Sequence, residues 1–148
     1  GKLKEYNCYT DASVAFNHDQ QEVLAGTSFV LVDMSEDRIV MSKGKTLPLK
    51  KKDNVFAELA AIVMALSECK SLLDEETVFR ICSDCQPALD IASGDRPVST
   101  KRMKSMAVKL EESVEDYPCD IHFQWVKSHS NHPINDFADL IAYHHARG

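Results

Sequence analysis

Residues 54–69 (NVFAELAAIVMALSEC) form an unbroken run of helix-favouring residues and predict a helix, with Asp53 or Asn54 as its N-cap. From residue 56 to residue 67 every face of this helix is apolar or small, and Glu58 is the only charged residue. A helix that is apolar all round must be buried, here against a sheet. The chain is therefore expected to fold into packed layers of helix and strand.

Segments rich in β-branched and aromatic residues lie on both sides of this helix and predict five strands. The predicted strands are residues 5–11, 25–33, 38–46, 77–84 and 120–127, and the other predicted helices are residues 87–93, 99–116 and 133–146. The polar link at residues 12–24 is expected to be a mobile loop. The element order is thus βββαβααβα, an α/β fold with a five-stranded mixed sheet and flanking helices.

Two aspartates end predicted strands, Asp11 the first and Asp84 the fourth. Because a helical crossover leads into the fourth strand, the first and fourth strands can lie side by side and parallel. Their carboxyl ends then lie about 5 Å apart, and two negative charges at that spacing require a cation or a shared proton. Each aspartate taken alone has a plainer explanation, because aspartate favours the turns that end strands.

Glu58 needs a compensating group, because an unpaired carboxylate on a buried helix is costly. The partner is either a lysine, such as Lys51 or Lys52, or a metal ion, or the surroundings of an active site that raise its pKa. The sequence leaves these alternatives open.

The last predicted helix carries two further aspartates, Asp136 and Asp139. Helical periodicity predicts that a stripe of larger side chains faces the core; its members are Phe137, Leu140, Ile141 and His144. Asp139 falls on another face, and Asp136 is favoured simply as an acid in the first turn. Periodicity alone predicts that both aspartates are solvated and does not choose between them.

The chain length of 148 residues fits a single domain, residues 1–148. No apolar run approaches the length of a membrane span. The five cysteines are an odd number without regular spacing, which favours a reducing, intracellular compartment, cytoplasmic or nuclear, over a secreted disulfide framework.

The net charge of −6 argues against a generally cationic nucleic-acid-binding protein. Ten of the seventeen basic residues nevertheless lie in two acid-free stretches, residues 38–52 and residues 100–110. Solvated surface faces explain such a pattern as well as a binding surface does.

Cys82 and Cys85 form a C-x-x-C pair that suggests zinc if His129 and His132 join it. The pair straddles a strand end, where alternation points its members in different directions, and no second pair has a standard spacing. A zinc site is therefore not expected.

Four acidic motifs follow one another along the chain. They are YTDAS with Asp11, FAELAAI with Glu58, CSDCQPAL with Asp84, and WVKSHSNHPINDFADLIA with Asp139. In order and context they resemble the ribonuclease H family, both the cellular type 1 enzymes and the domains of reverse transcriptases. The resemblance covers essentially the whole chain and implies an RNase H-like fold and hydrolysis of the RNA strand of RNA/DNA hybrids.

The resemblance also implies roles for individual residues. The four carboxylates would hold two Mg²⁺ ions, with Mn²⁺ as a possible substitute: Asp11 shared by both ions, Glu58 and Asp84 on one, and Asp139 on the other. His129, on the mobile loop, would relay protons. Residues expected to contact the hybrid are Ser13, Asn54, Gln86 and Asn135, together with Lys52, Lys101, Arg102 and Lys104 on its backbone.

The sequence also departs from the family pattern. Ala12 replaces the glycine usual after the first aspartate, the segment that follows is longer and polar, with Asn17 as a substitute contact, and the basic handle before the long helix is missing. These departures suggest a weak enzyme or a domain excised from a larger protein, such as one linked to a reverse transcriptase. The isolated chain is expected to be monomeric. The alternative is an inactive nucleic-acid-binding or tether domain of a larger retroelement or processing protein, although the presence of all four carboxylates favours an enzyme.

Overall fold

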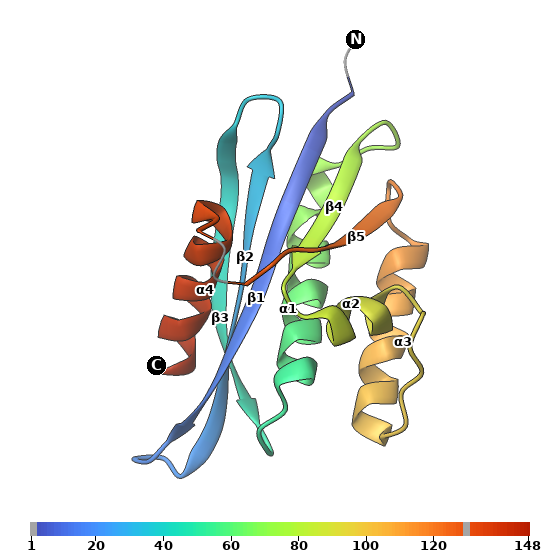
Figure 1. Cartoon of the computed structure of the whole chain (residues 1–148). Helices are drawn as coiled ribbons and strands as arrows, with labels where there is room; N and C mark the ends of the chain where they lie inside the picture. The colour runs from blue at the N-terminus through green and yellow to red at the C-terminus, as the bar shows by residue number, and fades with distance from the viewer. Residues whose placement is uncertain (1–2, 129–130) are drawn as a thin grey trace.

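The computed structural model describes residues 3–128 and 131–148. Five strands form one mixed sheet in the order β3-β2-β1-β4-β5 (Figure 1). The strands are β1 (Glu5–Asn17), β2 (Glu22–Asp33), β3 (Arg38–Leu49), β4 (Val78–Ser83) and β5 (Ile121–Trp125). β1, β2 and β3 pair antiparallel, whereas β4 lies parallel to both β1 and β5. The predicted five-stranded mixed sheet, with the first and fourth strands parallel and adjacent, is confirmed.

Four α-helices cover the sheet, and their order confirms the predicted βββαβααβα arrangement. They are α1 (Asn54–Cys69), α2 (Gln86–Ala92), α3 (Lys101–Glu115) and α4 (Pro133–Ala146), with a short 3₁₀ helix, Lys70–Leu72, after α1. Figure 1 shows α1, with α2 and α3 beside it, on one face of the sheet and α4 on the other. No helix in the described part of the chain is long and apolar enough to cross a membrane.

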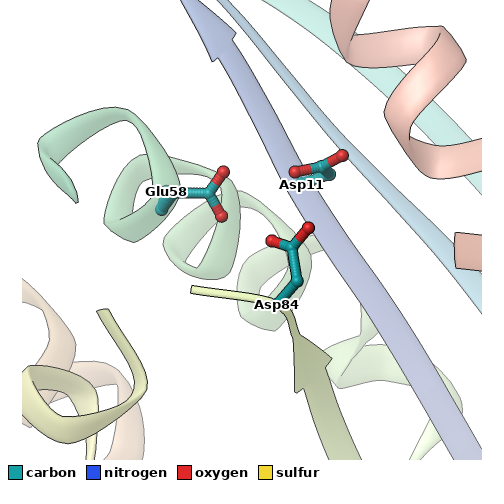
Figure 2. Close-up of side chains that lie close together, drawn as sticks. All are labelled: Asp11, Glu58 and Asp84. Carbon is teal, nitrogen blue, oxygen red and sulfur yellow. The ribbon is translucent and has the colours of Figure 1, made fainter. Parts of the chain in front are cut away.

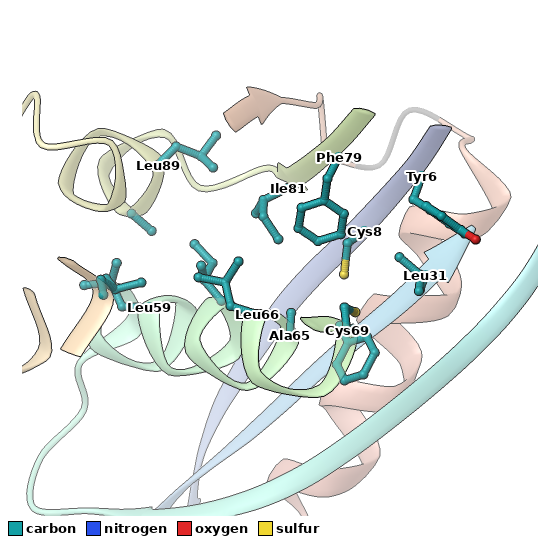
Figure 3. Packing of buried hydrophobic residues seen from close by; sticks show 14 of the residues in the cluster. Tyr6, Cys8, Leu31, Leu59, Ala65, Leu66, Cys69, Phe79, Ile81 and Leu89 are labelled. Carbon is teal, nitrogen blue, oxygen red and sulfur yellow. The ribbon is translucent and has the colours of Figure 1, made fainter. Parts of the chain in front are cut away.

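The main core lies between α1 and the sheet, as the apolar character of this helix predicts. Leu59 and Leu66 of α1 are fully buried and belong to one cluster with Leu31, Phe79 and Ile81 of the strands (Figure 3). The helix begins at Asn54, where Asp53 Oδ1 accepts a hydrogen bond from the Phe56 amide at 3.0 Å. This N-cap is one of the two that the sequence allowed.

Residues 12–24 do not form the predicted loop. β1 and β2 continue as a hairpin, with Ala12 opposite Thr27 and Asn17 opposite Glu22. Only residues 18–21 turn, and Gln21 adopts a left-handed φ of 52°. The prediction was wrong because polar composition does not exclude a strand. Val14 packs against a buried cluster of Ala25, Leu49 and Ala57, and pairing with β2 satisfies the backbone.

Of the core-facing stripe predicted for α4, Ile141 packs against the core, but the other three members are exposed. Phe137 and Leu140 are 38% and 52% exposed, and His144 is exposed, whereas the small residues of the helix are buried; these are Ala138, Ala142 and Ala146. The cause is how closely α4 approaches the sheet. A Cβ at Gly26 of β2 would overlap the carbonyl oxygen of Ala142, so only small side chains fit between them.

Candidate active site

Three carboxylates from separate parts of the chain point toward a common space (Figure 2). Asp11 lies in β1, Glu58 on α1 and Asp84 directly after β4. One oxygen atom from each lies within 4.8 Å of the other two. Among the described residues, this is the only group of three or more metal-ligating side chains with such close spacing.

The parallel pairing of β1 and β4 places the two aspartates side by side. Tyr9 pairs with Cys82, so Asp11 and Asp84 each lie two residues further along neighbouring strands. β4 ends at Ser83, whose Oγ accepts a hydrogen bond from the Cys85 amide at 3.0 Å, while β1 continues to Asn17. Asp84 therefore sits at the open end of one strand, and Asp11 lies in the middle of the other.

The electrostatics of this group are unfavourable without a compensating charge. Asp11 is only 5% exposed. Burial, then the charge of Asp84 and hydrogen bonding with Asp139, raise the pKa of Asp11 to about 8, against the opposing effect of the Ala12 amide, which donates to Oδ1 at 2.9 Å. Burial, followed by the charges of Asp11 and Asp84, also raises the pKa of Glu58 well above its ordinary value.

Glu58 gives the most direct indication that this group binds a cation. It is 7% exposed, and its Oε2 atom is buried with no hydrogen-bond partner among the described residues. Lys51 and Lys52, the structural partners that the sequence allowed, are exposed, and neither forms an ion pair with Glu58 in the described part of the chain. Carboxylate oxygens converging in this way fit hard divalent cations such as Mg²⁺ or Mn²⁺.

The fourth predicted ligand reaches the group from the other face of the sheet. Asp139 projects from α4 toward Asp11 and contributes to the raised pKa of Asp11. It is not a member of the tight group formed with Glu58 and Asp84. Asp136 is an exposed acid in the first turn of α4. Both aspartates are exposed, as periodicity predicted, and of the two it is Asp139 that raises the pKa of Asp11.

The structure describes only one of the two other predicted site residues near α4, Asn135 and His129. His129 lies outside the described residues. Asn135, a predicted hybrid contact, is 4% exposed at the start of α4, and its Oδ1 has no hydrogen-bond partner among the described residues.

His132, which the sequence suggested only as part of a zinc site, is the N-cap of α4. The helix N-cap pattern could have identified it, but histidine is not among the preferred N-cap residues.

The C-x-x-C pair does not form a metal site. Cys82 is buried in the cluster with Tyr9 and Ala138, beneath α4, whereas the half-buried Cys85 packs against the main core on the α1 side. The two thiols therefore belong to opposite faces of the sheet, as strand alternation predicted.

Three candidate hybrid contacts lie within four residues of a carboxylate along the chain. Ser13 follows Asp11 on β1 and is half-buried, while Asn54 and Gln86 are exposed first residues of α1 and α2. The Gln86 side chain is already engaged, since its Nε2 donates to Asp90 Oδ1 at 2.8 Å.

The predicted basic residues gather at one end of the molecule. In Figure 1 the β3–α1 connection, which carries Lys52, and the start of α3, which carries Lys101 and Lys104, lie at the same end. The Arg102 guanidinium lies 3.7 Å from the centre of the Phe56 ring, a cation–π contact that fixes the start of α3 against α1. The lysines themselves are exposed.

Comparisons with known proteins agree with this geometry. The model of the RNase H family, described as "RNase H", matches residues 3–147. No curated protein gives a significant match.

Solved structures with this fold include type 1 enzymes. RNase H1 from the halophilic archaeon Halobacterium salinarum NRC-1 is similar at a TM-score of 0.76 and 20% identity, over 95% of this chain and 96% of that one. LC11-RNase H1, isolated from compost by a metagenomic approach, is similar at a TM-score of 0.78 and 18% identity, over 97% and 96%. The same protein in complex with an RNA/DNA hybrid gives a TM-score of 0.75 and 15% identity, over 94% and 97%.

Proposed function

Because this chain belongs to the RNase H family, we propose that it is a metal-dependent endoribonuclease that hydrolyses the RNA strand of RNA/DNA hybrids. The observation that carries the proposal is the convergence of Asp11, Glu58 and Asp84, with one buried Glu58 oxygen left without a hydrogen-bond partner in the described part of the chain. Such a group costs stability unless a cation compensates it. An energetic cost of this kind is typical of a functional site.

The arrangement of the carboxylates supports a division of roles. Asp11 lies in the sheet between α1 and α4, and it interacts with Glu58 of α1 and with Asp139 of α4. It is therefore suited to be shared by two Mg²⁺ ions, with Glu58 and Asp84 holding one and Asp139 the other. A pair of bound ions supplies activation of the attacking water and stabilisation of the departing 3′ oxygen.

The hybrid is the proposed substrate because a structural neighbour was crystallised with an RNA/DNA hybrid. The 2′-hydroxyl distinguishes RNA from DNA at every sequence, and the amides of Asn54 and Gln86, which both donate and accept, suit its recognition. Gln86 would have to release Asp90 to do so. Ser13 and Asn135 complete the proposed contacts beside the carboxylates.

The basic residues are proposed to bind phosphates. Lys52, Lys101 and Lys104 are exposed at one end of the molecule, and Arg102 anchors the α3 segment there. Binding through these groups is sequence-independent and weakens with salt. His129 keeps its proposed role as the proton relay.

The proposal for the chain as a whole is a single RNase H domain, intracellular and monomeric when isolated. None of the three neighbouring structures named above is a reverse transcriptase, so linkage to a polymerase remains a prediction. The alternative is an inactive tether domain, which a cleavage experiment distinguishes from a nuclease.

The test is incubation of a labelled RNA/DNA hybrid with Mg²⁺ or Mn²⁺, beside RNA/RNA and DNA/DNA duplexes. Wild-type protein is expected to cleave only the RNA strand of the hybrid, and Asp84→Asn is expected to abolish cleavage. Binding of the hybrid without cleavage in either metal would reject the nuclease and support the tether.

A further inference from the structure

The first turn of α4 is fixed by an unusual cap. His132 has an extended backbone, and its Nδ1 accepts a hydrogen bond from the Asn135 amide at 3.3 Å. Its carbonyl oxygen accepts from the Asp136 amide at 3.0 Å. Serine, threonine, aspartate and asparagine are the usual residues at this position, so a histidine here calls for a second function of the ring.

The other ring nitrogen meets Tyr9 of β1. His132 Nε2 lies 3.5 Å from the Tyr9 hydroxyl oxygen, and the two rings are 5.0 Å apart with a tilt of 38°. Because Nδ1 accepts an amide hydrogen, it carries no proton, so in the neutral ring the proton is on Nε2 and is directed at Tyr9. One imidazole thus joins the helix terminus to the sheet.

Tyr9 is itself held by a polar chain across two strands. Asn7 Nδ2 donates to the Tyr9 hydroxyl at 3.3 Å, and Asn7 Oδ1 accepts from Arg80 Nη1 at 3.2 Å. Arg80 on β4 also pairs with Glu5. Tyr9 and Asn7 are buried, so the hydroxyl that receives His132 is a fixed point of the sheet.

This connection lies next to the carboxylates at both of its ends. Tyr9 precedes Asp11 by two residues on β1. His132 caps the first turn of α4, about two helical turns before Asp139. A rotation or shift of the start of α4 therefore moves Asp139 relative to Asp11, whose pKa it helps to raise.

We propose that His132 is a positioning residue: by capping α4 with one ring nitrogen and contacting Tyr9 with the other, it sets the place of Asp139 beside Asp11. The inference rests on the proposed function, since it takes Asp139 to be a metal ligand. His132 touches neither metal nor substrate in this role, and acts through Asp139.

The experiment measures Mn²⁺ binding to the metal-free protein by calorimetry, with no nucleic acid present. His132→Ala is expected to weaken Mn²⁺ binding about fivefold, the factor that corresponds to the loss of an ordinary N-cap. His132→Asn restores a short side-chain acceptor for the Asn135 amide but not the contact with Tyr9. It is expected to weaken Mn²⁺ binding about twofold to threefold, less than His132→Ala does.

Thr100→Ala is the matched control. Thr100 caps α3 by accepting from the Met103 amide at 3.2 Å, and α3 carries none of the four carboxylates. This variant is expected to melt at a lower temperature, as His132→Ala does, but to bind Mn²⁺ like wild type. Wild-type Mn²⁺ affinity in His132→Ala, or an affinity as weak in His132→Asn as in His132→Ala, would overturn the inference.

Tyr9→Phe keeps the inference falsifiable if His132→Ala does not fold. It removes only the oxygen that meets Nε2, and it is expected to weaken Mn²⁺ binding about twofold to threefold; unchanged binding would reject the role of the ring. Hybrid cleavage separates the two proposals. If the wild-type protein cleaves the hybrid and the variants bind Mn²⁺ as it does, only the positioning role is rejected. If the wild-type protein does not cleave the hybrid but the variants bind Mn²⁺ more weakly, only the nuclease is rejected.

Discussion

The hydroxyl of Ser28 on β2 donates a hydrogen bond to the carbonyl oxygen of Ala138 on α4, at 2.6 Å, although 110 positions separate the two residues along the chain. Both residues are fully buried. Since Asp139 follows Ala138 directly, this bond holds the backbone next to a proposed metal ligand.

Ser28→Ala is expected to destabilise the protein by about 1 kcal/mol, the usual value of a buried hydrogen bond, and to lower the melting temperature by a few degrees. Ser113→Ala is the control, because Ser113 Oγ makes a similar bond to the Lys109 carbonyl at 2.8 Å on the exposed face of α3. Thermal unfolding of both variants measures the difference. Equal losses of stability in the two variants would show that the buried bond to α4 stabilises the protein no more than the exposed bond within α3.

Gly26→Ala is expected to destabilise the fold by about 2–3 kcal/mol, because its Cβ would overlap backbone atoms of α4 that cannot move independently. Gly44→Ala is expected to cost less. Its Cβ would meet the side chains of His145 and Ile141, which can change rotamer. Denaturant unfolding tests this ranking, and a reversed order would mean that α4 shifts more easily than its packing indicates.

The stability of the metal-free protein is expected to fall as pH rises from about 4 to about 8. The pKa of Asp11 is raised to about 8 in the fold, so within this window the folded state binds more protons than the unfolded state, and unfolding becomes easier as the proton is lost. Melting temperatures of wild type and Asp11→Asn across this range measure the effect. The variant should show a flatter profile, and identical profiles would contradict the raised pKa.

Glu58→Gln is expected to separate stability from activity. At pH 8 the fold holds Glu58 either charged beside other carboxylates or protonated against its ordinary pKa, and both states cost free energy. A neutral glutamine avoids these costs and should stabilise the metal-free protein by about 1 kcal/mol. It should also abolish stabilisation by Mg²⁺ and reduce hybrid cleavage at least about a hundredfold. Melting temperatures with and without Mg²⁺ give the first readout and cleavage rates the second. Destabilisation of the metal-free variant would mean that the charge has a protein partner.

Lys101→Ala and Lys104→Ala are each expected to weaken hybrid binding and to make its dependence on salt shallower, by a slope of about 1 for each lysine that contacts a phosphate. Lys70→Ala is the control, since Lys70 follows the opposite end of α1 and pairs with Asp116 at 3.1 Å. Binding titrations at several salt concentrations provide the slopes. Unchanged slopes in both lysine variants would remove the start of α3 from the binding surface.

Much of this fold follows from the sequence because its patterns are local. The apolar faces of residues 56–67 predict a buried helix, and that helix covers the sheet as expected. Parallel pairing of the first and fourth strands follows from the crossover, and it brings Asp11 and Asp84 together.

The errors arise where a distant partner decides the structure. Residues 12–17 are strand because β2 pairs with them, and their own composition does not reveal this. Small residues of α4 are buried because Gly26 of β2, which has no side chain, lets the helix approach the sheet closely. Periodicity favours the larger side chains of a helix for its core face, and it therefore predicted burial of Phe137, Leu140 and His144, which are exposed.

The position of Asp11 between α1 and α4 links the site to the cooperativity of folding. Glu58 belongs to the layer on one face of the sheet and Asp139 to the layer on the other, so no fragment with a single layer contains the complete set of carboxylates. A cation bound by residues of both layers stabilises only the state in which both are docked. Partly unfolded forms in which α1 or α4 has left the sheet would then be less populated. The cation-bound protein would unfold both helical layers in a single transition.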